Sequence, residues 1–313
     1  MSTPRVRLLV GLVLLALVLA GIQWMVGWSQ LLAPWRAIAP ATLALAALLT
    51  LGSYAARALR LYDYFLPATR GGFAVCLKLT LLHNVFNNLL PMRTGEASFP
   101  VLMARYFATP LACSLAALLW FRLMDLHALA AVALIAVGGH WLDGWRVGAL
   151  ALVWLSLPWW LFRLQSAPAL VKLGQRAPPR WRARLARARD GLPQTPATFW
   201  RAWFWTLLNW LVKLAVFAWI LRLFAPLSPA AALLGAIGGD LTSVLPAHGI
   251  AGAGTYEAGV VAALLPFGVP ATAALAAAVN LHLFMLGLSL AGGALALLLP
   301  RDSTTTEMPC DHG

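Results

Sequence analysis

The stretch His83-Asn84-Val85-Phe86-Asn87-Asn88-Leu89-Leu90-Pro91-Met92-Arg93-Thr94-Gly95-Glu96 decides how the rest of the chain is arranged. It places amides, a proline, an arginine and a glutamate between segments that are apolar enough to lie in a membrane. A membrane helix that breaks at Pro91 leaves backbone groups that lipid cannot hydrogen-bond. We therefore expect protein or a water-filled cavity around this stretch, and we interpret its polar residues as a functional site.

A second stretch, residues 240–257 (DLTSVLPAHGIAGAGTYE), has the same ingredients. Both stretches run from polar residues through Leu-Pro to a basic or imidazole side chain, Arg93 or His248, and then to glycine and glutamate. Two interrupted apolar segments in corresponding halves are typical of an internally repeated transporter with its site between the repeats. Chance similarity is the alternative, because glycine and proline are common in membrane helices. The sequence leaves both interpretations open.

The composition indicates an integral membrane protein. Hydrophobic residues make up 61% of the chain and charged residues only 11%, against about a quarter charged in soluble proteins. The net charge of +13 then belongs to loops, where it sets topology and attracts anionic lipid, and no nucleic-acid module is visible. Three cysteines form neither a disulfide framework nor a metal-ligand spacing, so we predict no metal and no cofactor.

Six apolar runs are long enough to cross a hydrocarbon core of about 30 Å at about 1.5 Å per residue. They cover residues 8–26, 38–59, 110–137, 147–164, 199–224 and 269–299. The first run contains Val18-Leu19-Ala20, which resembles a signal-peptide cleavage site. Since the run continues beyond that site, we predict a retained membrane helix rather than a cleaved signal peptide.

The distribution of basic residues predicts the topology. Nine of them lie between Arg163 and Arg201 against one acid, Asp190, so the positive-inside rule places the loop of about residues 165–198 in the cytoplasm, together with both termini. Residues 72–108 must then enter and leave on the cytoplasmic side, and residues 229–265 on the opposite side. On this scheme 18 of the 23 basic residues are cytoplasmic, Arg36 and Arg146 are external, and three lie within helices.

Two further expectations concern the polar segments. Within the basic loop, Trp181, Leu185, Ala188 and Leu192 fall close to one helical face, which fits either a short helix on anionic headgroups or a solvated loop. Residues 301–313 are expected to form a disordered tail. The predicted fold is thus one all-α polytopic membrane domain, residues 1–300, with about six transmembrane helices and two re-entrant hairpins in an approximate inverted repeat.

Three motifs of this chain resemble those of the lysylphosphatidylglycerol synthase transmembrane-region family: Asn84-x-x-Asn87-Asn88-x-x-Pro91-x-Arg93-x-Gly95-Glu96, Arg122-x-x-Asp125, and Leu245-Pro246-Ala247-His248-Gly249 through Gly254-Thr255-Tyr256-Glu257. The family is the membrane half of bacterial multiple-peptide-resistance proteins and also occurs alone. The resemblance implies lipid handling in the bacterial inner membrane. The longest polar stretch, about residues 165–198, is too short for a transferase domain, so we do not expect a synthase.

The first hairpin offers candidate ligands for a lipid headgroup. A half-helix that begins near Glu96 would direct its partly positive N-terminus into the membrane beside Arg93, a geometry that can receive a phosphate. Asn84, Asn87 and Asn88 share a helix surface and can hydrogen-bond a headgroup. Alternatively, the amides satisfy the broken backbone and Arg93 pairs with Glu96. His248 and Glu257 would serve the second hairpin in the same way.

Other polar residues inside apolar runs predict an intramembrane network. Arg122 and Asp125, three residues apart, fit a structural pair or a gate. Lys213 shares a helix face with Asn209 and needs an acid such as Asp240, Glu96 or Glu257. Asn280 and His282 lie near the middle of the last run, where a histidine serves either packing or proton transfer.

We predict a lipid translocase, or flippase-like transporter, for an anionic or aminoacylated phospholipid or a related lipid-linked substrate. No nucleotide-binding loop is visible, so a gradient, proton coupling or passive scrambling would drive it. Its partners would be membrane lipids and enzymes of envelope lipid biosynthesis. The alternatives are an accessory subunit of envelope lipid or glycan biosynthesis and a lipid-modifying enzyme in which Asp240, His248 and Glu257 act as acid and base, although no nucleophile-base-orienter set is recognisable.

Overall fold

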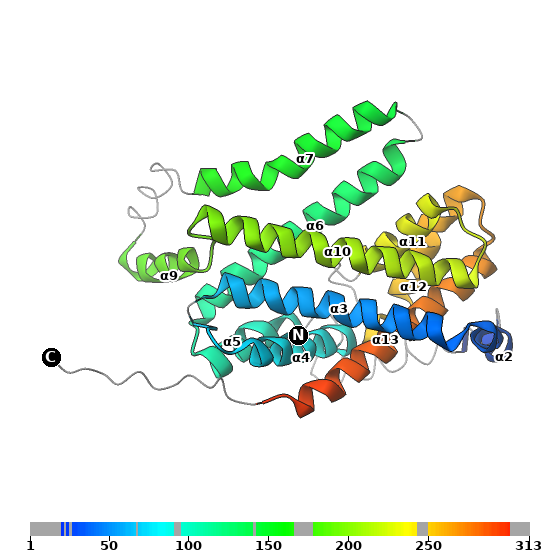
Figure 1. Cartoon of the computed structure of the whole chain (residues 1–313), viewed down its shortest axis with the longest axis horizontal. Helices are drawn as coiled ribbons and strands as arrows, with labels where there is room; N and C mark the ends of the chain where they lie inside the picture. Colours follow the sequence, from blue (N-terminus) through cyan, green and yellow to red (C-terminus); the bar gives the residue numbers. More distant parts are fainter. Residues whose placement is uncertain are drawn as a thin grey trace.

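The computed structural model describes residues 20–21, 23–24, 27–66, 68–90, 95–139, 142–165, 178–242 and 250–300, and within them all regular structure is helical (Figure 1). Among the described helices, five are long and apolar enough to cross a membrane: α3 (Pro40–Tyr64), α6 (Leu111–Gly138), α7 (Gly144–Gln165), α10 (Pro196–Phe224) and α13 (Ala271–Leu298). The prediction of an all-α protein with several membrane spans is therefore confirmed. The predicted first span, residues 8–26, lies almost entirely outside the described residues, as does the predicted tail.

The five long helices form a bundle in which consecutive spans run in opposite directions. Helices α3 and α10 lie side by side along the long axis, and α13 crosses the bundle beneath them (Figure 1). Proline begins α3 and α10 at the first helical position, where no backbone N–H is lost. Short α2 (Trp28–Leu32) and η1 (Ala33–Ala37) precede α3 at the end where α3 starts.

Two helical hairpins are inserted between the long helices, one near each end of the bundle (Figure 1). The first consists of α4 (Phe73–Leu89) and α5 (Ser98–Phe107), and the second of α11 (Pro229–Thr242) and α12 (Thr255–Leu264), followed by η4 (Leu265–Phe267). Helices α5 and α12 have ten residues each, about 15 Å, half the thickness of a hydrocarbon core. The two hairpins lie in residues 72–108 and 229–265, the segments that the charge-based scheme predicts to enter and leave the membrane on the same side.

The break between α4 and α5 follows from the local sequence. Leu90 ends α4 in an extended conformation (ψ 137°), as expected for a residue that precedes proline. Where the chain returns, a Cβ atom on Gly95 would overlap the backbone of Phe86 and Asn87. In the second hairpin, Cβ atoms on Gly238 and Gly259 would each meet the backbone of the other glycine. Small residues thus let both hairpins close tightly.

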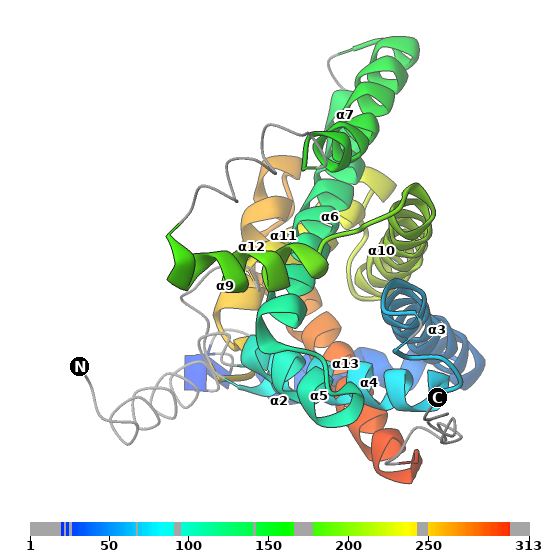
Figure 2. The same ribbon diagram turned by 90° about the vertical axis from the view of Figure 1, so that its left-hand side faces the viewer.

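Helix α7 is held to α6 by two reciprocal hydrogen bonds. Pro158 lies inside α7 and has no N–H for the carbonyl oxygen of Trp154, four residues earlier. His127 Nε2 of α6 bonds this oxygen, while Trp154 Nε1 donates to the carbonyl oxygen of His127 at 3.1 Å. The imidazole and indole rings also stack with centroids 4.6 Å apart. The C-terminal half of α7 also contacts α10, where the rings of Trp159 and Phe162 lie 5.5 and 5.2 Å from that of Phe199, whereas its N-terminal part stands away from the bundle (Figure 2).

The basic segment does contain a helix, α9 (Pro179–Asp190), which lies across the bundle end near α5 and packs on α6 (Figure 2). Its Leu185 is exposed. The following loop is fixed by Tyr64, whose hydroxyl donates to the carbonyl oxygen of Gly191 at 2.9 Å. A helix is thus observed, and its position on anionic headgroups stays a prediction.

The structure corrects one assumption of the charge-based scheme, that all the basic residues counted as cytoplasmic lie in loops. Arg57 and Arg60, which the scheme counts as cytoplasmic, lie within α3, and Arg60 is only 7% exposed. Lys78 is also buried. Its ammonium group donates a hydrogen bond of 2.7 Å to the carbonyl oxygen of Leu299, at the C-terminal end of α13. A cation at that position stabilises the unpaired carbonyl groups of a helix end. Two of the three side chains are therefore parts of the interior rather than topology signals.

Candidate functional site

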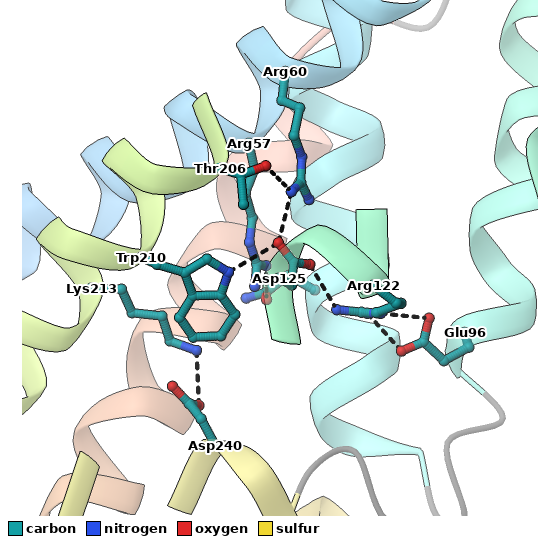
Figure 3. A network of polar contacts seen from close by, with 10 residues as sticks. Arg57, Arg60, Glu96, Arg122, Asp125, Thr206, Trp210, Lys213 and Asp240 are labelled. Atoms are coloured by element: carbon teal, nitrogen blue, oxygen red, sulfur yellow. Dashed lines mark hydrogen bonds and ion pairs between the residues drawn. The ribbon is translucent and has the colours of Figure 1, made fainter. Parts of the chain in front are cut away.

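Asp125, near the middle of α6, is the centre of a polar network between the helices (Figure 3). Its Oδ1 accepts hydrogen bonds from Arg60 Nη1 at 2.7 Å and from Trp210 Nε1 at 2.9 Å. Thr206 Oγ1 accepts a second bond from Arg60 at 2.9 Å, and Arg122 Nη1 lies 3.5 Å from Asp125 Oδ2. Because both oxygens of the buried carboxylate have cationic neighbours, its charge is compensated. Asp125 thereby joins α3, α6 and α10.

Arg122 connects this network to the first hairpin. Its Nη2 lies 2.6 Å from Glu96 Oε1 and its Nε lies 3.3 Å from Glu96 Oε2, a two-point contact that fixes both side chains (Figure 3). The predicted Arg122–Asp125 pair exists, but Glu96 is the closer partner. Arg93, predicted beside Glu96, lies outside the described residues.

The asparagines of α4 face α3 and α13. Arg57 Nη1 donates to Asn84 Oδ1 at 3.1 Å and forms no ion pair with any described residue. The side-chain nitrogens of Asn84 and Asn88 donate to Ser289 Oγ at 3.4 and 3.1 Å. Asn87 Oδ1 is buried and has no hydrogen-bond partner among these residues. The sequence interpretation missed Arg57, although it lies three residues from Arg60 on an apolar run, a spacing that indicates one helix face.

The second hairpin supplies two polar pairs. Lys213 of α10 forms an ion pair with Asp240 of α11 (Nζ to Oδ1, 2.9 Å), so the acid required by Lys213 is Asp240 (Figure 3). Glu257 accepts from the backbone N–H of Gly254 at 2.8 Å, and its other oxygen lies 2.6 Å from His282 Nδ1. His248 lies outside the described residues.

Three buried polar groups beside these pairs have no partner within the described part of the chain. They are Tyr256 Oη, His282 Nε2 and the side-chain amide of Asn209. Tyr256 and His282 are 2% and 3% exposed, and their rings lie 4.5 Å apart. Buried polar groups are normally hydrogen-bonded, so these atoms indicate water or a ligand. Asn280, in contrast, lies outside the network, because it bonds Trp35 Nε1 and the carbonyl oxygen of Leu31.

A cavity of about 90 Å³ lies where these groups meet. About 10–15 Å³ is enough for one water, so several waters or one small anionic group can occupy it. The two hairpins and the helices α3, α6, α10 and α13 line it, with polar side chains from Tyr54, Arg57, Asn84, Asn87, Asn88, Arg122, Asp125, Lys213, Asp240, Tyr256 and His282. Three cations therefore face two carboxylates. Asn209, Glu96 and Glu257 are not among the lining residues.

The lining of the cavity suits the binding of an anion. Guanidinium and amide groups bind phosphate through charge-assisted hydrogen bonds. Among the described residues, no serine, threonine or cysteine lines the cavity. In the described part of the chain, no group of three His, Cys, Asp or Glu side chains has the geometry of a metal site.

Comparison with known proteins agrees with the motif resemblance. A search of curated proteins finds no match for this chain. The model of the family described as lysylphosphatidylglycerol synthase TM region matches residues 6–293. This range contains both hairpins and all described residues that line the polar cavity. It also contains the described long helices, apart from the last residues of α13. The chain therefore belongs to the lysylphosphatidylglycerol synthase transmembrane-region family.

Proposed function

We propose that this protein is a lipid translocase of the bacterial inner membrane. The observation that carries the proposal is the cavity in the bundle interior, which is lined by both hairpins and by Arg57, a guanidinium without a carboxylate partner among the described residues. Arg57 is partly buried and forms no ion pair with a described residue, so it lacks a direct counter-charge. The phosphate of a lipid headgroup supplies that counter-charge.

The remaining lining suits the other groups of such a headgroup. Asn87 Oδ1 accepts hydrogen bonds, and His282 Nε2 accepts them when Nδ1 carries the proton shared with Glu257. The hydroxyl of Tyr256 both donates and accepts. Hydroxyl or ammonium groups of the lipid would bind these atoms while Arg57 holds the phosphate. This division favours a phospholipid with a polar or aminoacylated headgroup.

The hairpins provide a route to both leaflets. We interpret them as re-entrant elements of an inverted repeat, inserted from opposite sides of the membrane. Charged pairs tie each hairpin to a long helix, among them Glu96 to Arg122 of α6 and Asp240 to Lys213 of α10. Movement of one hairpin would open the cavity to one side while the other ion pair stays closed. On the charge-based topology, the α4–α5 hairpin and α9 face the cytoplasm.

Reconstitution tests the proposal. Purified protein is placed in liposomes that contain phosphatidylglycerol with a fluorescent headgroup, and an impermeant quencher reports the lipid that reaches the outer leaflet. The wild type should accelerate this movement, and Arg57→Gln should slow it by roughly ten- to a hundredfold, since a charge-assisted contact contributes about 1.5–3 kcal/mol. Arg201→Gln is the matched control, because Arg201 is exposed on α10 outside the cavity.

The same liposomes separate the alternative functions. An enzyme would change the mass of the lipid, which mass spectrometry detects. An accessory subunit would neither move nor modify lipid when reconstituted alone. Equal rates for wild type, Arg57→Gln and empty liposomes would refute the translocase.

A further inference from the structure

A second hollow of the molecule is apolar. It lies between α6, α7 and α11 and has a volume of about 820 Å³. This volume is within the range of about 300–1,000 Å³ that is typical of ligand pockets. Leu123, Leu134 and Val137 line it from α6, Trp154 from α7 and Leu241 from α11. Its one histidine, His127, already bonds the Trp154 carbonyl oxygen. A polar ligand would find little to bind here, whereas hydrocarbon would.

This groove shares a wall with the polar cavity. Leu126 and Leu129 of α6 line both spaces. Arg122 and Asp125 line the cavity, and Leu123 lines the groove. Leu126 and Leu129 therefore lie at the boundary between a polar and an apolar face of α6. Helix α11 repeats the pattern on the other side of the boundary: its Asp240 lines the cavity, and its next residue, Leu241, lines the groove. Polar and apolar spaces therefore meet between α6 and α11.

No described helix fills the groove. Helix α7 packs on α6 through the His127–Trp154 contacts and on α10 through Trp159, and its N-terminal part stands away from the rest of the bundle (Figure 2). From this geometry we infer that the groove holds the acyl chains of the same lipid whose headgroup occupies the cavity. The headgroup would pass between α6 and α11, beside Leu126 and Leu241. The inference rests on the proposed function and adds the site for the chains.

Photocrosslinking distinguishes a bound lipid from ordinary bilayer lipid. Phosphatidylglycerol with a diazirine on an acyl chain is incorporated into proteoliposomes, irradiated, and the labelled peptides are mapped. We expect labelling of the groove at Leu123–Val137 and Trp154 that falls about tenfold in Arg57→Gln, because loss of the phosphate contact weakens binding of the whole lipid. Labelling at the exposed Leu115 and Leu119 of the same helix should not change. Equal groove labelling in wild type and Arg57→Gln would overturn the inference.

A steric variant gives an independent readout. Leu241 is 43% exposed, so Leu241→Trp narrows the groove without a large change in the core. We expect lipid movement to slow about tenfold, the effect of losing contact with about two methylene groups. Binding of chain-free glycerophosphoglycerol, measured by calorimetry, should stay unchanged. Leu119→Trp, at a 63% exposed position of α6 that does not line the groove, is the matched control and should behave as wild type.

The outcomes separate the two proposals. If the wild type moves no lipid but the groove labelling depends on Arg57, the translocase is wrong and the combined site stands. If the wild type moves lipid while Leu241→Trp and Leu119→Trp both move it at the wild-type rate, the translocase stands and the acyl-chain site is wrong.

Discussion

The pair Arg60–Asp125 allows a quantitative test of the network. Their side chains are 8% and 6% exposed, and the atoms Arg60 Nη1 and Asp125 Oδ1 lie 2.7 Å apart. Asp125→Asn keeps the shape of the side chain but removes its charge, so the Arg60 guanidinium stays buried with the Thr206 hydroxyl as its hydrogen-bond acceptor. Removal of one partner of a buried ion pair costs about 3–5 kcal/mol. We expect the free energy of unfolding to fall by that amount.

The assay is reversible unfolding in mixed micelles of mild detergent and dodecyl sulfate, followed by tryptophan fluorescence. Asp143→Asn is a matched control, since Asp143 pairs with Arg146 at 3.6 Å but the two side chains are 67% and 55% exposed. Its loss should cost no more than about 1 kcal/mol. The double variant Arg60→Met/Asp125→Leu should be more stable than the sum of the two single losses predicts, because neither charge is left alone. Costs below about 1 kcal/mol for Asp125→Asn, with strict additivity in the double variant, would refute the reasoning.

Two other features give direct predictions. Gly238→Ala should destabilise the protein by about 1–3 kcal/mol in the same micelle assay, because its methyl group would meet the backbone of Gly259, whereas Gly287→Ala, with open space around it, should be neutral or slightly stabilising. If both variants have the same free energy of unfolding, the close packing of α11 on α12 does not limit the size of the side chain at position 238. In a background without the native cysteines, Gly139→Cys should react with an impermeant thiol reagent added to spheroplasts and Leu185→Cys in α9 should not; the reverse pattern would invert the topology.

The class of protein and the positions of the hairpins follow from local features of the sequence. Apolar runs are local features of about 20 residues, and they correctly predict the five described spans. Proline at position 91 disfavours a helical conformation of Leu90, so the end of α4 can be predicted from the sequence. The family assignment rests on motifs whose residues are close together in the chain. These properties need no knowledge of how the helices pack.

The partners inside the network could not be predicted, because they depend on how each helix is rotated against its neighbours. Arg60 stands at the end of an apolar run and reads as a topology signal, yet its partner Asp125 is 65 residues away. Glu96 contacts Arg122, which lies 26 residues further along the chain. Asn280 and His282 are two residues apart on α13, and since such residues face different directions, they join different clusters.

The long reach of the Arg60 contacts has a consequence for how the chain enters the membrane. During synthesis at about 5–20 residues per second, Arg60 precedes Asp125 by 65 residues and Thr206 by 146, or roughly 3–13 s and 7–29 s. Throughout the first interval α3 carries two guanidinium groups near its C-terminal end without Asp125. Each would cost about 2.5–3.5 kcal/mol at the centre of a lone helix and less near its end. We expect α3 to wait at the insertion machinery until α6 emerges, so that the two helices partition into lipid as a neutralised pair.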